Sequence, residues 1–166
     1  MVPPTVGLLI LDVDGVLTDG ALVMTGDGET SKRFHVQDGY AVKLWQSRGG
    51  RVGVVSGRSG DAVARRAEEL DIDVARLGVH DKLAGYKSVL DEVGVGDDSV
   101  VYVGDDYPDL PPMRRCAVPV AVANAVPAIK RAAAYVTRRG GGRGAVAEIV
   151  ELILRKQGRW SRDGIE

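Results

Sequence analysis

The sequence predicts an α/β fold in which a parallel sheet lies between two layers of helices, formed by a single domain of residues 1–166. Three observations predict it: short apolar runs rich in valine, stretches with helical spacing between them, and two aspartates at the end of the first run. Apolar runs of this length suit strands that are buried on both faces, as in parallel sheets. Strands that alternate with helices imply right-handed crossover connections.

The predicted strands define the sheet. They are Val6–Leu11, Arg51–Val55, Val74–Leu77, Val100–Val103 and Ala117–Val122. Between and after them, helical spacing predicts helices over Tyr40–Gln46, Ala62–Leu70, Leu83–Val93 and Ala145–Leu154. We expect Asp38 to cap the first of these helices, and Ser59 or Asp61 to cap the second. Gly94 is expected to end the third.

The segment Leu17–Val36 does not fit this alternation. It predicts two strands joined by a turn at Gly26-Asp27-Gly28. Because this hairpin follows the first strand directly, it would project as a flap from the carboxyl edge of the sheet. No later insertion is large enough to form a separate cap domain. The glycine run Gly140–Gly144 is the only segment expected to be flexible, and it opens a C-terminal tail of about residues 140–166.

Composition excludes several classes of partner. The 22 basic residues nearly balance the 23 acidic ones, so we expect neither nucleic acid nor a membrane surface to bind. The lone Cys116 excludes an internal disulfide and fits a reducing compartment. No apolar stretch is long enough to cross a bilayer, and the N-terminus lacks the pattern of a signal peptide. The expectation is a cytoplasmic globular protein.

Polar residues follow the predicted strands where ligands bind in open parallel sheets, at the carboxyl ends. Asp12-Val13-Asp14-Gly15 follows the first strand, and Ser56-Gly57-Arg58 follows the second. Asp81-Lys82 starts a helix, while Gly104-Asp105-Asp106 follows the fourth strand with Asp109 close behind. Adjacent carboxylates repel each other and resist desolvation, so stability does not call for them. They make sense where a cation or a phosphoryl group binds.

These side chains suit phosphoryl transfer. A carboxylate such as Asp12 can attack phosphorus and form an aspartyl phosphate. A second carboxylate two residues on, Asp14, can protonate the leaving oxygen and then activate water. Magnesium prefers oxygen ligands and offsets the charge of the phosphate. Ser56 and Lys82 can hold the remaining phosphoryl oxygens.

The segments DVDGVLTDG, SGR, DKL and GDDYPDL, in this order, resemble the haloacid dehalogenase superfamily of phosphohydrolases, from Leu8 to about Leu154. The resemblance implies a Rossmann-like sheet and Mg²⁺ as cofactor. It implies Asp12 as nucleophile and Asp14 as general acid and base. The other roles that it implies are phosphate binding by Ser56, Gly57 and Lys82, metal binding by Asp12, the Asp14 carbonyl and Asp105, and support from Asp106 and Asp109. A helix cap and a turn acid are the alternative readings of Asp106 and Asp109.

Within that superfamily the short length, the hairpin and the ending GGRGAVAEIVELIL resemble the capless Kdo-8-phosphate phosphatase group. Phosphatases of nine-carbon sugar-acid phosphates are similar. The resemblance implies a homotetramer and a small sugar-acid phosphate as substrate, with Arg58 and Arg143 as candidates for binding it. Two positions depart from the common pattern. Ala147 stands where an arginine is usual, and Leu110 where an aromatic is often found.

Other functions remain open from the sequence. They are a phosphatase of another small phosphometabolite, a phosphotransferase or mutase, a phospho-receiver domain and a non-catalytic oligomeric scaffold. Phosphotransferases and mutases usually carry a cap domain, which this chain lacks. A receiver domain would carry its acceptor aspartate on a later strand than the acid pair. Intact motifs at every position argue against a scaffold.

Overall fold

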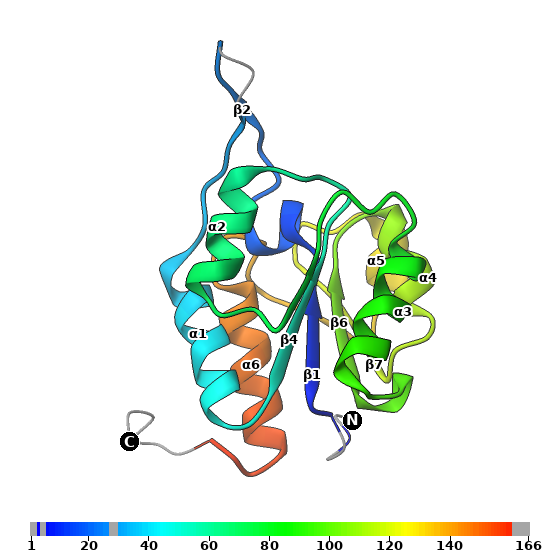
Figure 1. The fold of residues 1–166 in the computed structure, drawn as a ribbon. Coiled ribbons are helices and arrows are strands. Elements are labelled where there is room, and N and C mark those ends of the chain that lie inside the picture. Colours follow the sequence, from blue (N-terminus) through cyan, green and yellow to red (C-terminus); the bar gives the residue numbers. More distant parts are fainter. Residues whose placement is uncertain (1–2, 4–5, 27–29, 161–166) are drawn as a thin grey trace.

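The structure, a computed structural model, describes residue 3 and residues 6–26 and 30–160. A six-stranded parallel sheet lies between two layers of helices (Figure 1), which confirms the predicted fold class. In chain order the elements are β1 (Leu8–Leu11), β2 (Val23–Met24), β3 (Thr30–Ser31), α1 (Val36–Ser47), β4 (Arg51–Val55), α2 (Asp61–Glu69), β5 (Val74–Arg76), α3 (Lys82–Val93), β6 (Val100–Gly104), α4 (Leu110–Met113), β7 (Val118–Ala121), α5 (Pro127–Ala132), β8 (Tyr135–Val136) and α6 (Ala145–Lys156).

The sheet has the order β5-β4-β1-β6-β7-β8. Helices α1, α2 and α6 cover one face, and α3, α4 and α5 cover the other (Figure 1). Strand β1 lies in the middle, because Leu8–Leu11 pairs with β4 on one side and β6 on the other. All four of its side chains are buried. The residues that directly follow β1 therefore enter at the centre of the carboxyl edge.

All five predicted strands are present, but three further elements were not predicted. Strand β8 has two residues at the sheet edge, too few to show a pattern. Helix α4 contains two prolines, and α5 starts with one, so neither shows the usual helical spacing. The αL conformation of Gly94 ends α3, as expected. Along the described ranges, every helix is too short or too polar to cross a bilayer.

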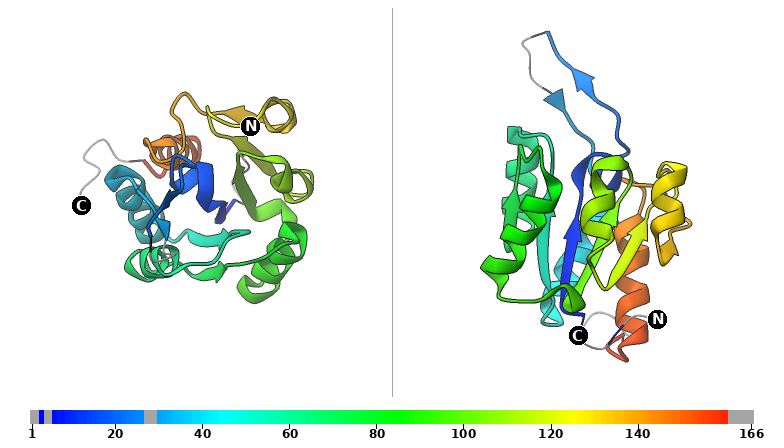
Figure 2. Two further views of the ribbon diagram at one scale, coloured as in Figure 1. Left: turned by 90° about the horizontal axis from the view of Figure 1, so that it is seen from above. Right: turned by 90° about the vertical axis from the view of Figure 1, so that its right-hand side faces the viewer.

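The predicted hairpin is present and stands clear of the sheet (Figure 2). Strands β2 and β3 pair antiparallel, with Val23 opposite Ser31 and Met24 opposite Thr30. Of the predicted turn, residues 27 and 28 lie outside the described residues. The hairpin leaves the molecule beyond the carboxyl edge, on the same side as the residues that follow β1 (Figure 1).

Two of the predicted helix caps are wrong. Helix α2 begins after Gly60 without a side-chain cap, so neither Ser59 nor Asp61 performs that role. Helix α1 already begins at Val36, two residues before Asp38, so Asp38 cannot cap it.

Asp38 instead caps the start of α6, which packs beside α1 (Figure 1). Its buried carboxylate accepts hydrogen bonds from the backbone N–H of Gly144, at 3.1 Å, and of Ala147, at 2.9 Å. Burial raises the pKa of Asp38, and the backbone donors at the start of α6 act against that rise. Asp38 thereby ties together two helices that are about a hundred residues apart.

Replacing Asp38 with alanine should therefore destabilise the fold. The change leaves the N–H groups of Gly144 and Ala147 without their acceptor, which costs about 2 kcal/mol in the free energy of unfolding. Urea denaturation followed by circular dichroism measures it. Asp91→Ala, an exposed change on α3, is the control, with an expected effect below about 0.5 kcal/mol. Equal effects of the two changes would refute the capping role.

Candidate active site

The predicted site residues converge at the carboxyl edge of the sheet, in a hollow of about 560 Å³. Asp12 follows β1, Ser56 follows β4, Lys82 begins α3 and Asp105 follows β6. The predicted residues that line the hollow are Asp12, Asp14, Ser56, Gly57, Arg58, Lys82, Asp105 and Asp106. Asp109 is fully buried next to them. Arg143 does not line the hollow; it is exposed, and its Nη2 lies 4.0 Å from Asp19 Oδ2.

Lys82 joins the two buried acids of the site. Its ammonium Nζ lies 2.8 Å from Asp12 Oδ1 and 2.6 Å from Asp109 Oδ1. Burial disfavours the charged ammonium, but the two carboxylates outweigh it and raise the pKa of Lys82. For Asp12, burial and then repulsion by Asp109 raise the pKa to about 6, although Lys82 opposes the shift. Lys82 is therefore a fixed cation beside Asp12.

Both carboxylate oxygens of Asp109 accept hydrogen bonds from neighbouring groups. Its Oδ1 accepts hydrogen bonds from Lys82 and, at 2.8 Å, from the Tyr102 hydroxyl. Its Oδ2 accepts from the backbone N–H of Asp105, at 3.0 Å, and of Asp106, at 3.2 Å. The Asp106 side chain in turn caps the short helical turn that carries Asp109. These contacts, with the pairing to Lys82 among them, fit the supporting role that the resemblance implies for Asp109.

Asp105 has the properties of a metal ligand. Oxygen atoms of Asp12, Asp105 and Asp109 lie within 4.8 Å of one another. Asp105 Oδ1 is buried without a hydrogen-bond partner among the described residues. Burial and then repulsion by Asp12 and Asp109 raise its pKa to about 8. A divalent cation would relieve both the repulsion and the unpartnered oxygen, so Asp12 and Asp105 fit such an ion.

Asp14 lies on an irregular turn that ends at Leu17, and two cations approach it. Arg58 Nε is 3.8 Å from Asp14 Oδ2. Lys32, from the hairpin, donates a hydrogen bond to Asp14 Oδ1. The sequence analysis missed Lys32, because nothing in the pattern around a hairpin lysine shows that it points back into the site.

Ser56 is buried at the end of β4, with its hydroxyl oxygen facing the next loop. Ser56 Oγ accepts a hydrogen bond from the Arg58 backbone N–H at 3.2 Å. The hydroxyl proton remains available to donate to an oxygen of a bound anion. Its position fits the predicted phosphate-binding role.

The glycine run Gly140–Gly144, expected to be flexible, is packed against the turn after β1. The backbone N–H of Gly142 donates to the Val16 carbonyl at 3.0 Å. A Cβ on Gly141 would lie 1.8 Å from the Gly15 carbonyl oxygen. The Asn124 amide bridges the two segments, donating to Gly15 O at 3.0 Å and accepting from Gly141 N at 2.6 Å. Close backbone contact, and not flexibility, explains these glycines.

The helix predicted over Ala145–Leu154 is present within the expected C-terminal tail. Residues 145–156 form α6, which buries six of its side chains in the core. Residues 161–166 lie outside the described part.

Comparison with known proteins identifies the relatives of this chain. A family model of haloacid dehalogenase-like hydrolases matches residues 72–150. The 3-deoxy-D-manno-octulosonate 8-phosphate phosphatase of Escherichia coli K12 is 41% identical over 152 residues, which cover 92% of this chain and 81% of the relative. The chain belongs to the haloacid dehalogenase-like hydrolases.

Solved structures of relatives agree. The enzyme of the same name from Moraxella catarrhalis, in complex with magnesium, phosphate and KDO, is 35% identical with a TM-score of 0.90 over 93% of this chain and 89% of that one. A cobalt-bound deoxy-D-mannose-octulosonate 8-phosphate phosphatase from Haemophilus influenzae is 36% identical with a TM-score of 0.93, covering 97% and 96%.

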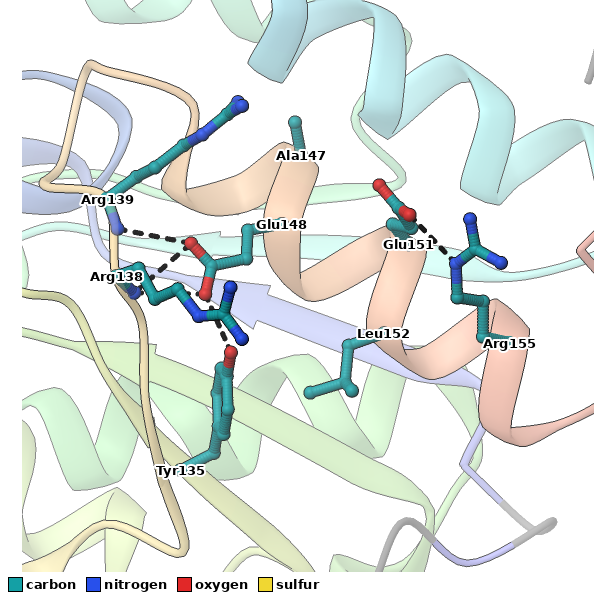
Figure 3. Close-up of a pocket in the computed structure, with 8 residues that line it drawn as sticks. All are labelled: Tyr135, Arg138, Arg139, Ala147, Glu148, Glu151, Leu152 and Arg155. Carbon is teal, nitrogen blue, oxygen red and sulfur yellow. Dashed lines mark hydrogen bonds and ion pairs between the residues drawn. The ribbon is translucent and has the colours of Figure 1, made fainter.

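A second hollow of about 330 Å³ lies between β8 and α6 of this hydrolase (Figure 3). Ala147, where the common family pattern has an arginine, lines it. Its two glutamates both have partners. Glu148 accepts hydrogen bonds from the Tyr135 hydroxyl and from backbone N–H groups, and Arg155 pairs with Glu151 (Figure 3). Apart from this departure, the hollow contains no predicted site residue.

The packing of Gly141 predicts that Gly141→Ala damages the site. The added methyl group displaces the turn that carries Asp14, so phosphatase activity should fall at least about tenfold, and the melting temperature should fall as well. The control is Gly26→Ala, since a Cβ there meets nothing within 4 Å. Wild-type activity in Gly141→Ala would contradict the close approach.

The raised pKa values predict how stability depends on pH without metal. Asp12 and Asp105 bind protons more tightly in the folded chain, with pKa values of about 6 and 8, than in the unfolded chain, where the ordinary value is 3.8. The folded state then holds more protons between about pH 4 and 8, so the free energy of unfolding should fall as pH rises through that window.

Urea denaturation in chelator at pH 5 and pH 8 measures this fall. Asp105→Asn, which cannot ionise, should flatten it, and added Mg²⁺ should restore stability at pH 8 in the wild type alone. A wild-type curve that rises from pH 5 to pH 8, or one unchanged by Asp105→Asn, would contradict the prediction.

Proposed function

We propose that the chain is a magnesium-dependent phosphomonoesterase that hydrolyses a small sugar-acid phosphate, Kdo-8-phosphate or a close relative. The observation that carries this proposal is the meeting of Asp12 and Asp105 at the ends of β1 and β6, with Lys82 Nζ 2.8 Å from Asp12. The Moraxella and Haemophilus relatives, whose structures hold magnesium or cobalt, support the metal. The relatives' shared name supports the substrate.

The residues divide the reaction into two steps. In the first, an Asp12 oxygen attacks phosphorus, the bond between phosphorus and the sugar oxygen breaks, and Asp14 gives that oxygen a proton. In the second, Asp14 takes a proton from water, the water oxygen attacks phosphorus, and the bond to Asp12 breaks to release phosphate. Bound Mg²⁺, held by Asp12, Asp105 and the Asp14 carbonyl, supplies positive charge against the phosphate.

Binding falls to the remaining residues of the hollow. Ser56, the Gly57 backbone and Lys82 hold phosphoryl oxygens, as fixed donors that need no rearrangement during the reaction. Arg58 stands at the rim with most of its side chain exposed, where its guanidinium can take the carboxylate of a sugar acid. Arg143 is the weaker candidate, because it lies outside the hollow beside Asp19.

Water rather than a second substrate hydroxyl is the proposed acceptor. Across the described residues the hairpin is the only projection from the carboxyl edge, and no cap domain covers the hollow (Figure 1). A mutase must keep water out while the phosphoryl group waits, which an open site does poorly.

We also propose a homotetramer built around the hairpins. The hairpin and the start of α1 expose apolar side chains, among them Met24 at 78% and Val36 at 83% of full exposure. Exposed apolar patches of this kind favour burial against another subunit. We propose a cytoplasmic location as well. The lone, buried Cys116 supports it, because a free cysteine suits a reducing environment.

Phosphate release from a panel of substrates tests the function. With Mg²⁺, Kdo-8-phosphate should be turned over well above neutral hexose phosphates, and chelator should abolish the reaction. The panel includes a nine-carbon sugar-acid 9-phosphate. Uniformly slow turnover of all substrates would remove the sugar-acid assignment but keep the chemistry.

Asp12→Asn is the decisive variant, because the amide cannot attack phosphorus. Turnover should fall at least about a thousandfold, while folding stays intact. Asp91→Asn, the same change at an exposed position on α3, should leave turnover unaltered. Substantial phosphate release by Asp12→Asn would overturn the nucleophile assignment.

A further inference from the structure

One lysine of the hairpin is turned inward while its neighbours face solvent. Lys32 directly follows β3, and only 4% of its side chain is exposed. Ser31 before it and Arg33 after it are both exposed, with 74% of the Arg33 side chain accessible. Burying a lysine costs desolvation energy, so it persists where a specific partner compensates. The hairpin otherwise has few buried contacts.

The partner of Lys32 is the Asp14 carboxylate, on the turn after β1. Within residues 6–26 and 30–160, Lys32 Nζ makes the only side-chain hydrogen bond to Asp14. The other oxygen of Asp14 faces Arg58 at 3.8 Å, which is too long for a hydrogen bond. The Asp14 side chain remains partly open to the hollow. One residue of the hairpin therefore fixes the orientation of this carboxylate.

A second ion pair joins the two arms of the hairpin segment near its base without reaching Asp14. Arg33 Nη2 donates to Asp19 Oδ2. Asp19 also accepts a hydrogen bond from the Ala21 backbone N–H, so it is held locally. The base of the hairpin is thus held by groups other than Lys32 and Asp14. This separates the two roles that an inward lysine could have, attachment of the hairpin and orientation of Asp14.

We propose that Lys32 is a positioning residue that orients the Asp14 carboxylate for proton transfer and makes that orientation depend on the hairpin lying over the hollow. The inference rests on the proposed phosphatase function. Among the described residues Lys32 makes no hydrogen bond or ion pair with Asp12 or Lys82, so it acts through Asp14. Its effect is therefore confined to the steps in which Asp14 moves a proton.

The consequence is a dependence on the leaving group. Phenyl phosphate and p-nitrophenyl phosphate share one ring, but p-nitrophenolate leaves readily without a proton and phenolate does not. Misplacing a general acid slows the first reaction far more than the second. The ratio kcat/KM reports the steps up to the first irreversible one, which includes departure of the leaving group. A merely structural lysine would affect both substrates alike.

The experiment compares Lys32→Met, Lys32→Arg and Arg33→Met with the wild type, in Mg²⁺, on these two esters and on Kdo-8-phosphate. Lys32→Met should lower kcat/KM about 30-fold or more for phenyl phosphate and Kdo-8-phosphate, and less than about threefold for p-nitrophenyl phosphate. Lys32→Arg should recover part of the loss, because it keeps a donor. Arg33→Met should change both aryl esters by the same factor.

Several outcomes would overturn the inference. Equal losses on the two aryl esters in Lys32→Met, or the same selective pattern in Arg33→Met, would assign Lys32 to hairpin attachment only. Melting temperatures check that each variant folds, and Lys32→Gln replaces Lys32→Met if the latter does not. A wild type that hydrolyses none of the three esters refutes the proposed function itself. A wild type that is active, but whose Lys32 variants show no selectivity, refutes only the role of Lys32.

Discussion

The buried ammonium of Lys82 is the interaction on which the rest of the site depends. Three carboxylates converge within 4.8 Å, and isolated from any cation they would repel one another strongly. Lys82 contacts Asp12 and Asp109 together and so makes their burial tolerable. The Tyr102 hydroxyl and two backbone N–H groups donate the other hydrogen bonds that the Asp109 carboxylate accepts. Asp105 has no such partner for its Oδ1, so it is the carboxyl group that a bound cation would compensate.

The site is built from parts of different rigidity. Asp12 and Asp105 follow central strands whose side chains are buried, so their positions are fixed by the sheet. Asp14 lies one step further out, on a turn whose Gly15 has a φ of +93°. A Cβ on Gly15 would lie 2.0 Å from Asp105 Oδ2, so this backbone and the acid cluster fit together only with glycine. The sheet thus positions Asp12 and Asp105, the proposed nucleophile and metal ligand, while loops hold Asp14, the proposed general acid and base.

The sequence was sufficient for the parts of the site that follow a simple rule. Each of Asp12, Ser56 and Asp105 comes directly after an apolar run, and the carboxyl ends of parallel strands always meet at one edge. The resemblance in four short segments then assigned their roles. The observed ends of these strands differ from the predicted ends by at most two residues, because the limits of a valine-rich run are visible in the sequence.

Three of the failures share one physical cause, which is contact between residues far apart in the chain. Asp38 has the sequence context of a local cap, yet its partners are 106 and 109 residues away. The glycine run has the composition of a flexible linker, but its glycines allow two backbones to touch. Lys32 and Arg33 are neighbouring cations in the hairpin, and only the folded structure shows that Lys32 contacts Asp14. Local pattern carries no information about such partners.

The packing of Gly141 on Gly15 has a consequence for the order of folding. The segment that carries Asp12 and Asp14 is synthesised well before the segment that completes their turn, because Asn124 and Gly141 lie more than a hundred residues further along the chain. Asn124 and Gly141 must be present before the backbone at Gly15 has its native neighbours. Contacts of such long sequence separation form late and slow the folding of the whole domain. The turn that carries Asp14 therefore reaches its native surroundings only after segments more than a hundred residues further along the chain have been made.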